Sequence, residues 1–188
     1  MTSAKREIRQ FAREQRDQMD IDPSWSEEAA SIFMGAVKPS ANQIVSLYFP
    51  MGNELDTLPL AEELWKSGIK TALPIIQGKA QPLLFAEWSK STKLQSSTFG
   101  TQEPAEPNFI APDILVVPLL AFDQVGNRMG LGQGHFDATL KSLRAEKNIL
   151  AVGYAYSTQA VLLALPTEPH DEKLDMVITE QRVFDFRP

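Results

Sequence analysis

The sequence contains no cysteine and only two histidines among its 188 residues. The absence of cysteine excludes disulfide bonds, thiolate nucleophiles and cysteine-ligated zinc sites. Because His135 and His170 are the only histidines, we do not expect a histidine-ligated metal site. A composition without cysteine is compatible with the cytoplasm, and a cytoplasmic location is our expectation.

Long apolar runs and an excess of positive charge are also missing. No apolar stretch approaches the ~20 residues that a membrane span requires, and the charged N-terminus lacks the apolar region of a secretory signal. The net charge of −6 argues against nucleic acid as the main partner, because phosphate backbones bind basic surfaces. We therefore expect no nucleic acid and no membrane, whereas the charge does not exclude a small anionic ligand in a locally basic pocket. A monomer is also our expectation.

The length and the order of predicted elements define the fold class. A chain of 188 residues with 43% hydrophobic and 22% charged residues is typical of one globular domain, here residues 1–188. Apolar segments predict strands, which alternate with amphipathic helices, the first over residues 2–19. The predicted strands are 43–49, 71–73, 83–88, 114–117, 149–154 and 176–179. This order predicts a three-layer α/β/α, Rossmann-like fold with a mostly parallel central sheet, and residues 89–112 as a long surface connection.

The most informative stretch runs from residue 114 to residue 140. A predicted buried strand is followed by turn residues, by Arg128, and by three alternating glycines, Gly130, Gly132 and Gly134, before a helix. Such a glycine loop allows main-chain N–H groups to converge on phosphate oxygens at the positive end of a helix. The spacing matches neither common phosphate-binding pattern, so a loop that only lets strand and helix pack closely is an equal alternative.

Two charged residues flank this loop. Arg128 could supply a cation to a phosphate, and Asp137 could supply an oxygen ligand to Mg²⁺. A surface ion pair and an aspartate that complements the helix dipole are the alternative interpretations.

Further candidate residues lie outside the loop. Lys5 and Arg9 are four positions apart on the first helix, on the face that also carries Arg13 and Arg16, and could bind a polyphosphate. A solvated basic face is the commoner reason for such a pattern. Glu54 follows the predicted strand 43–49, at the end where α/β sheets bind ligands, although an exposed loop acid is an alternative.

Taken together, these segments resemble the 5-formyltetrahydrofolate cyclo-ligase family, also called methenyltetrahydrofolate synthetase. The resemblance covers nearly the whole chain and is strongest from Val117 to Asp137, close to the family pattern vPglaFD-x-x-G-x-RlGyGgGyYD. Supporting matches are Lys5 with Arg9, Glu54 with Asp56-Thr57, Phe99-Gly100 with Glu103-Pro104, and Gln159, Asp171, Asp175 and Thr179-Glu180.

The resemblance implies a reaction. ATP, accompanied by Mg²⁺, would phosphorylate the formyl oxygen of 5-formyltetrahydrofolate, with or without a polyglutamate tail. The other folate nitrogen would then attack the activated carbon, and phosphate would leave to give 5,10-methenyltetrahydrofolate and ADP. Phosphoryl transfer of this kind needs mainly positioning and neutralisation of charge from the protein.

The resemblance also implies the roles of individual residues. It implies that Arg128 and Asp137 are catalytic, with Asp137 as the Mg²⁺ ligand, and that Glu54 bonds the pterin. Met51, with Trp88 as a further candidate, would pack on the pterin ring, and Phe136 would also bind the substrate. The implied ATP-binding residues are Lys5, Arg9, Arg128, Gly130, Leu131, Gly132, Gln133, Gly134, His135 and Phe136.

The loop departs from the family pattern at five positions. Residues Leu131, Gln133, His135 and Phe136 stand where tyrosine, glycine or lysine, tyrosine and tyrosine are common, and Ala138 where arginine is frequent. Two alternatives follow. One is a homologue that binds folate and nucleotide with reduced or lost catalysis, and the other is a sugar-phosphate or CoA-type enzyme on a related fold.

Overall fold

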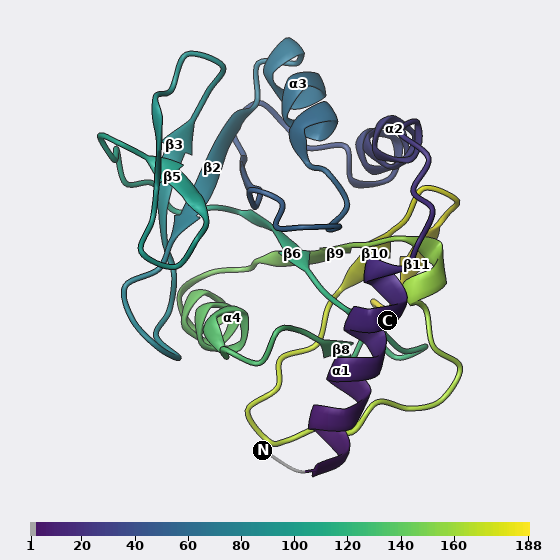
Figure 1. The fold of residues 1–188 in the computed structure, drawn as a ribbon. Coiled ribbons are helices and arrows are strands. Elements are labelled where there is room, and N and C mark those ends of the chain that lie inside the picture. Colours follow the sequence, from purple (N-terminus) through teal and green to yellow (C-terminus); the bar gives the residue numbers. More distant parts are fainter. Residues whose placement is uncertain (1–2) are drawn as a thin grey trace.

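The computed structural model describes residues 3–188, as four α-helices and eleven strands (Figure 1). The predicted helix start at Thr2 lies outside these residues. In chain order the elements are α1 (Ser3–Asp17), α2 (Trp25–Val37), β1 (Ile44–Ser46), α3 (Leu58–Lys66), β2 (Lys70–Ile75), β3 (Leu84–Trp88), β4 (Leu94–Ser96), β5 (Gln102–Pro104), β6 (Ile114–Pro118), β7 (Ala121–Phe122), β8 (Arg128–Met129), α4 (His135–Glu146), β9 (Leu150–Tyr154), the 3-10 helix η1 (Ser157–Gln159), β10 (Met176–Ile178) and β11 (Val183–Asp185).

Seven strands form the central sheet, in the order β11-β10-β9-β6-β1-β2-β3. The five inner strands run parallel, and the two edge strands, β11 and β3, run antiparallel to their neighbours. Val45 of β1 lies between Thr71 of β2 and Ile114 of β6, which fixes the register at the centre. The predicted mixed α/β fold with a mostly parallel sheet is therefore confirmed.

Helices cover both faces of this sheet (Figure 1). On one face α2 and α3 contribute Phe33 and Leu64 to a core that includes Val45. On the other face α4 contributes Leu140 to a second core that includes Val117. Both faces of the inner strands are thus buried, which explains why their sequences are apolar without alternation.

The chain leaves neighbouring strands β1 and β6 in opposite directions across the sheet. From β1 it passes through α3 to β2, and from β6 it passes through α4 to β9. Because the two connections lie on opposite faces, the loops after β1 and β6 separate and leave a crevice at the carboxyl ends of these strands.

Two local predictions were wrong. Residues 89–112 contain the antiparallel pair of β4 and β5, so this segment is more than a connection. Strand β2 also continues through Pro74 to Ile75, opposite β3. Pairing with β1 extends only to Ala72, so Pro74 lies where β2 has one neighbour and its missing N–H is tolerated.

Substitution of Gly153 tests the packing of the second core. A Cβ at this β9 residue would lie 2.7 Å from Leu174 Cδ1 and 2.8 Å from both Leu119 Cδ2 and Val177 Cγ2. We expect Gly153→Ala to lower the free energy of unfolding by about 1–3 kcal/mol, because the buried neighbours must shift. Gly35→Ala in α2 is the matched control, since nothing lies within 4 Å of its Cβ position, and it should raise stability by about 0.5–1 kcal/mol. Equal effects in urea unfolding would contradict this account.

Candidate active site

A cavity of about 420 Å³ opens at the carboxyl ends of β1 and β6. Its wall is formed by α1, the loop after β1, the glycine loop with the start of α4, and residues 99–102 of the β4–β5 hairpin. Thirteen of the fourteen candidate site residues line this cavity: Lys5, Arg9, Met51, Glu54, Arg128, Gly130, Leu131, Gly132, Gln133, Gly134, His135, Phe136 and Asp137. Their individual roles stay predictions.

Trp88 does not line the cavity, so the prediction that it packs on the pterin ring is wrong. It lies opposite Thr71, at the start of β2 and therefore at the end of the sheet remote from the cavity. Its ring packs edge-on against Trp65, with centroids 5.1 Å apart. An antiparallel strand such as β3 places its last residues beside the first residues of its neighbour, and the sequence could not reveal this direction.

The glycine loop joins β8 to α4 and adopts backbone conformations that side chains disfavour. Gly132 has φ of +90° and Gly134, the residue preceding α4, has φ of +74°. Arg9 packs directly on this loop: its Nε donates to the carbonyl of Gly130 at 2.7 Å, and a Cβ at Gly132 would lie 3.0 Å from its Cζ. The glycines thus leave backbone of the loop at the wall of the cavity, beside the first turn of α4 and with Arg9 packed against Gly132.

Arg128 and Asp137 bond each other across the loop. Arg128 Nη2 donates to Asp137 Oδ1 at 2.7 Å, and the Arg128 side chain is only 5% exposed. Its Nη1 donates to the carbonyl of Glu172, whose own N–H donates to Asp137 Oδ1 at 3.0 Å. Burial lowers the pKa of Arg128, while Asp137 counters the effect. Arg128 and Asp137 therefore form an ion pair, as the alternative interpretation expected. The pair lines the cavity and is not on the open surface.

Lys5 is buried among carboxylates. Its Nζ lies 2.9 Å from Glu168 Oε2 and 2.5 Å from Asp171 Oδ2. Burial alone would lower the pKa of Lys5, but these two bonds outweigh it and raise the pKa. The interpretation of Lys5 as part of a solvated basic face is therefore wrong.

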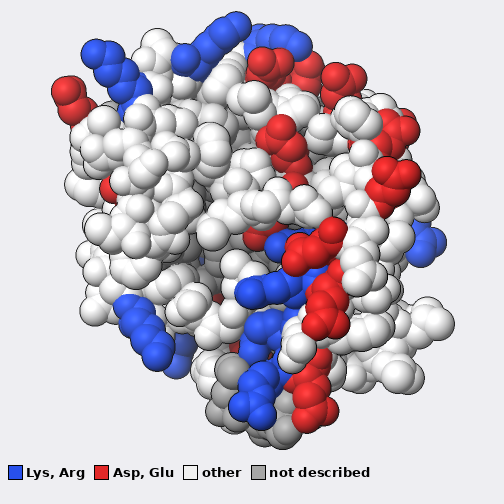
Figure 2. Space-filling view, in the orientation of Figure 1, with Lys and Arg blue, Asp and Glu red and all other residues white. Residues whose placement is uncertain are grey.

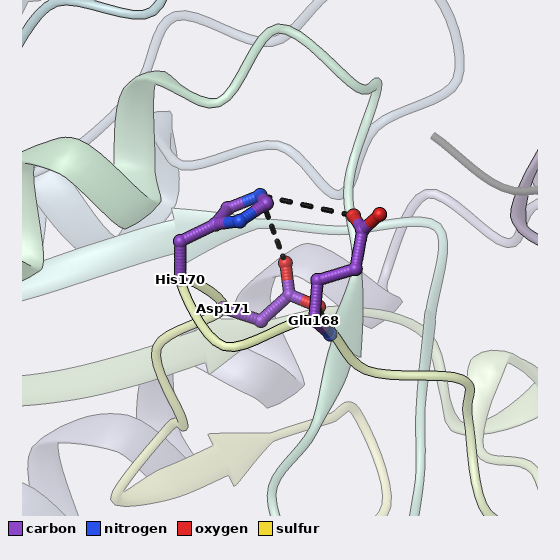
Figure 3. Close-up of side chains that lie close together, drawn as sticks. All are labelled: Glu168, His170 and Asp171. Atoms are coloured by element: carbon purple, nitrogen blue, oxygen red, sulfur yellow. Dashed lines mark hydrogen bonds and ion pairs between the residues drawn. The ribbon is translucent and has the colours of Figure 1, made fainter.

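Glu168 and Asp171 also approach His170 (Figure 3). Its Nε2 lies 3.7 Å from Glu168 Oε2 and 3.8 Å from Asp171 Oδ1. The three side chains offer ligand atoms within 4.8 Å of one another, which is close enough for a metal ion. Because Lys5 already bonds both carboxylates, a lysine ammonium supplies the positive charge at this cluster.

Glu54 lies in the cavity wall with its carboxylate nearly buried. Oε2 accepts a hydrogen bond from the N–H of Met51 at 3.0 Å, and Oε1 lies 3.5 Å from Nη1 of Arg16. Burial raises the pKa of Glu54, and the Met51 N–H and Arg16 partly offset this rise. Glu54 is therefore not the exposed loop acid of the alternative interpretation.

Three charged residues were missed by the site prediction: Arg13 and Asp171 line the cavity, and Arg16 supports Glu54. Arg13 and Arg16 share the helical face of Lys5 and Arg9, and that spacing was the available signal. Figure 2 shows Lys and Arg side chains gathered over α1, beside a rim of Asp and Glu. A locally basic site therefore exists on a protein of net negative charge.

A glycine loop, cations and a buried carboxylate around the switch point of a parallel sheet define an α/β enzyme. The model of the 5-formyltetrahydrofolate cyclo-ligase family matches residues 1–180, and the chain belongs to this family. The 5-formyltetrahydrofolate cyclo-ligase of Escherichia coli K12 is 34% identical over 148 residues, covering 76% of this chain and 80% of that protein.

Other relatives agree with this membership. The cyclo-ligase of Haemophilus influenzae is 36% identical over 136 residues, covering 69% of this chain and 72% of that protein. The NMR structure of Aquifex aeolicus 5,10-methenyltetrahydrofolate synthetase superposes with a TM-score of 0.81 at 29% identity, covering 98% of this chain and 93% of that one. The chain is thus an enzyme of the cyclo-ligase class with the fold of that synthetase. No helix of residues 3–188 is long and apolar enough to span a bilayer.

Replacement of Lys5 tests how α1 is held at the cavity. In Lys5→Met, two carboxylates lose their shared cation, so we expect faster amide exchange in α1 and a lower Tm at pH 7. The bonds from Lys5 lower the pKa of Glu168 and, against the effect of burial, that of Asp171. The ion pairs of Lys5 stabilise the folded protein fully above the ordinary carboxyl pKa values near 4. This stabilisation is lost as the pH falls through the lowered pKa values, so the difference in Tm between wild type and Lys5→Met should shrink in acid.

Lys66→Met provides the control for this experiment. Lys66 pairs with Glu63 on the surface of α3, where its side chain is 67% exposed. Exposed pairs contribute little to stability. A loss of Tm in Lys5→Met no greater than in Lys66→Met would contradict the role of Lys5 in holding α1.

Proposed function

We propose that this enzyme converts 5-formyltetrahydrofolate to 5,10-methenyltetrahydrofolate in a reaction that consumes ATP and requires Mg²⁺. The observation that carries the proposal is one cavity with two chemically different ends. One end is a glycine loop with cations, suited to a polyphosphate, and the other is a buried carboxylate beside apolar side chains. Family membership supplies the folate substrate and the type of reaction.

The phosphate end is supported by the backbone of the loop and by Arg9. Glycines at 130, 132 and 134 leave the main chain accessible, and the first turn of α4 adds N–H groups and the positive end of its dipole. Arg9 is already held against the loop by its bond to Gly130. These groups would bind phosphate oxygens and neutralise their charge.

The residues present also fit a magnesium ion. Arg128 and the Glu172 N–H both donate to Oδ1 of Asp137, and no residue of the described chain bonds Oδ2. Carboxylate oxygen is the ligand type that Mg²⁺ prefers, and Arg128 fixes the carboxylate that would supply it. When bound, Mg²⁺ would neutralise charge on the transferred phosphoryl group.

The folate end is supported by Glu54 and its surroundings. A pterin presents an amino group and a ring N–H side by side, and a carboxylate can accept both bonds at once. Tyr48, Phe49, Met51 and Phe136 line the same cavity and offer apolar surface to a flat ring. Because Glu54 is nearly buried, these bonds would form away from water, where they are stronger.

In the proposed reaction the formyl oxygen attacks the γ-phosphorus and ADP leaves. The second folate nitrogen then attacks the formyl carbon and loses its proton, and the former formyl oxygen leaves as part of inorganic phosphate. The protein contributes positioning of the two substrates and neutralisation of charge, which suffice for phosphoryl transfer. The loop amides and Arg9 act on the phosphates, and Glu54 holds the pterin.

A product assay tests the proposal. Purified enzyme with 5-formyltetrahydrofolate, ATP and Mg²⁺ should form the methenyl product, detected by its absorbance, and omission of ATP should abolish the reaction. Binding of both ligands without product would instead support the homologue with lost catalysis, which rests on the changes at Gln133, Phe136 and Ala138. Family membership removes the support for a sugar-phosphate or CoA-type enzyme.

Asp137→Asn tests the metal site. The asparagine oxygen can still accept the bonds from Arg128 and the Glu172 N–H, so the protein should fold, whereas alanine would leave the buried Arg128 without its partner. Loss of a metal ligand should lower kcat at least about a hundredfold and raise the Mg²⁺ concentration needed for half the maximal rate. Asp175→Asn makes the same change outside the cavity, where Asp175 bonds Arg144. An unchanged Mg²⁺ dependence in Asp137→Asn would refute the metal role.

Glu54→Gln tests the folate end. Loss of charge-assisted hydrogen bonds worth about 1.5–3 kcal/mol should raise KM for 5-formyltetrahydrofolate roughly ten- to hundredfold. KM for ATP should change little, because the phosphates lie at the other end of the cavity. Both KM values are measured by steady-state kinetics with each substrate varied in turn. A rise confined to KM for ATP would show that Glu54 has been assigned to the wrong ligand.

A further inference from the structure

We propose that Arg16 is a positioning residue, which holds the Glu54 carboxylate ionised and oriented for the pterin. This inference rests on the proposed function of Glu54 as the folate-binding carboxylate. Arg16 does not line the cavity itself, so its effect on the ligand would pass through Glu54.

The geometry places Arg16 behind Glu54. Arg16 lies near the end of α1, and both side chains of this ion pair are only 6% exposed. The Arg16 Nη1 lies 3.5 Å from Glu54 Oε1, while Met51 N–H occupies Oε2. The carboxylate is thus held from one side by the loop backbone and from the other side by α1.

One atom of Arg16 points to a role beyond stability. Its Nε is fully buried and has no hydrogen-bond partner in the described part of the chain. A buried donor without a partner costs about 1–3 kcal/mol, and burying a guanidinium costs more. An apolar side chain would avoid this cost, so the arginine is better explained by what it does to Glu54.

A second contact ties the same two segments together. Asn53 Nδ2 donates to the carbonyl of Asp17, the residue after Arg16, at 3.3 Å. The loop turns sharply at Gly52, where φ is +57°, and the Glu54 N–H bonds the Met51 carbonyl. The carboxylate therefore sits on a short, tied turn whose support is the last turn of α1.

Among the described residues, Arg16 is the one charged group that favours ionisation of Glu54, beside the uncharged N–H of Met51. Tyr48, at the end of β1, is buried beside Glu54, and Tyr156, near Arg16, adds no positive charge. Asp56 and Glu180 contribute negative charge to the surroundings of Tyr156. Burial already raises the pKa of Glu54, so removal of Arg16 would raise this pKa further.

Helix α1 would then connect the two ends of the cavity. Lys5 and Arg9 lie in its first half, and Arg16 is eleven positions after Lys5, about 16 Å along a helix that rises ~1.5 Å per residue. The same helix therefore carries cations for the phosphate end and the support for the folate end.

A double-mutant cycle between Arg16 and Glu54 tests the inference. We expect Arg16→Met to raise KM for 5-formyltetrahydrofolate about tenfold, with a smaller change in kcat, and to move the acidic limb of the kcat/KM profile upward by about one pH unit. In a Glu54→Gln background the same change should alter KM less than about twofold, because the group through which Arg16 acts no longer ionises. Arg16→Lys, which keeps the charge, should restore most of the acidic limb.

The controls separate this role from a structural one. Arg6→Met removes an exposed arginine from the same helix and should leave both KM and the pH profile unchanged. Multiplicative effects of Arg16→Met and Glu54→Gln, or an unmoved acidic limb in an active Arg16→Met enzyme, would overturn the inference. If Arg16→Met does not fold, the cycle is measured with Arg16→Gln, which removes the charge and keeps a polar side chain, and independence from Glu54 would again overturn the inference.

Failure of the proposed function would give a different result. A wild-type enzyme that forms no methenyl product refutes the proposed reaction, whatever Arg16 does. The double-mutant cycle is then measured as the binding free energy of 5-formyltetrahydrofolate by calorimetry. If the effects of Arg16→Met and Glu54→Gln on that free energy are additive, the inference about Arg16 is refuted independently of the proposed reaction.

Discussion

The site depends on one constraint, the separation of the chain at the carboxyl ends of β1 and β6. These strands are neighbours, but the connections that follow them cover opposite faces of the sheet. The backbone therefore cannot close over the gap between them, and loops from both strands supply its walls. Glu54 comes from the first loop and Arg128 with the glycines from the second, so residues far apart in sequence meet in one cavity.

Helix α1 completes this cavity without belonging to the two main cores. Its apolar residues Ile8 and Ala12 pack on a small cluster with Met129 and Leu165. Its other attachments are polar: Lys5 to Glu168 and Asp171, Arg9 to Gly130, and Arg16 to Glu54. A helix held with so little apolar contact opens locally more easily than the core, which suits an element that carries ligand-binding groups.

The sequence predicted the parts of the fold that depend on local pattern. Apolar runs located the inner strands, and their alternation with helices predicted the parallel sheet, because burial of both faces leaves a readable signal. The resemblance to the family predicted that the glycine loop, Lys5, Arg9 and Glu54 belong to one site. Features that leave no apolar pattern in the local sequence were missed. The partners of Lys5 lie more than 160 positions away, the pairing of β4 with β5 has no strong apolar pattern, and the direction of β3 put Trp88 at the wrong end.

The charges of the cavity explain why an acidic residue belongs at its phosphate end. Among the described residues, four cations line it, Lys5, Arg9, Arg13 and Arg128, against three acids, Glu54, Asp137 and Asp171, so this part of the lining carries a net charge of +1 (4 − 3). A free triphosphate would bring several negative charges close to Asp137 and meet repulsion there. A divalent cation held by Asp137 would reverse the sign of that interaction, so on the proposed function the acid would favour the metal-bound nucleotide. On the same proposal, the role of Arg128 is to orient the Asp137 carboxylate through their ion pair.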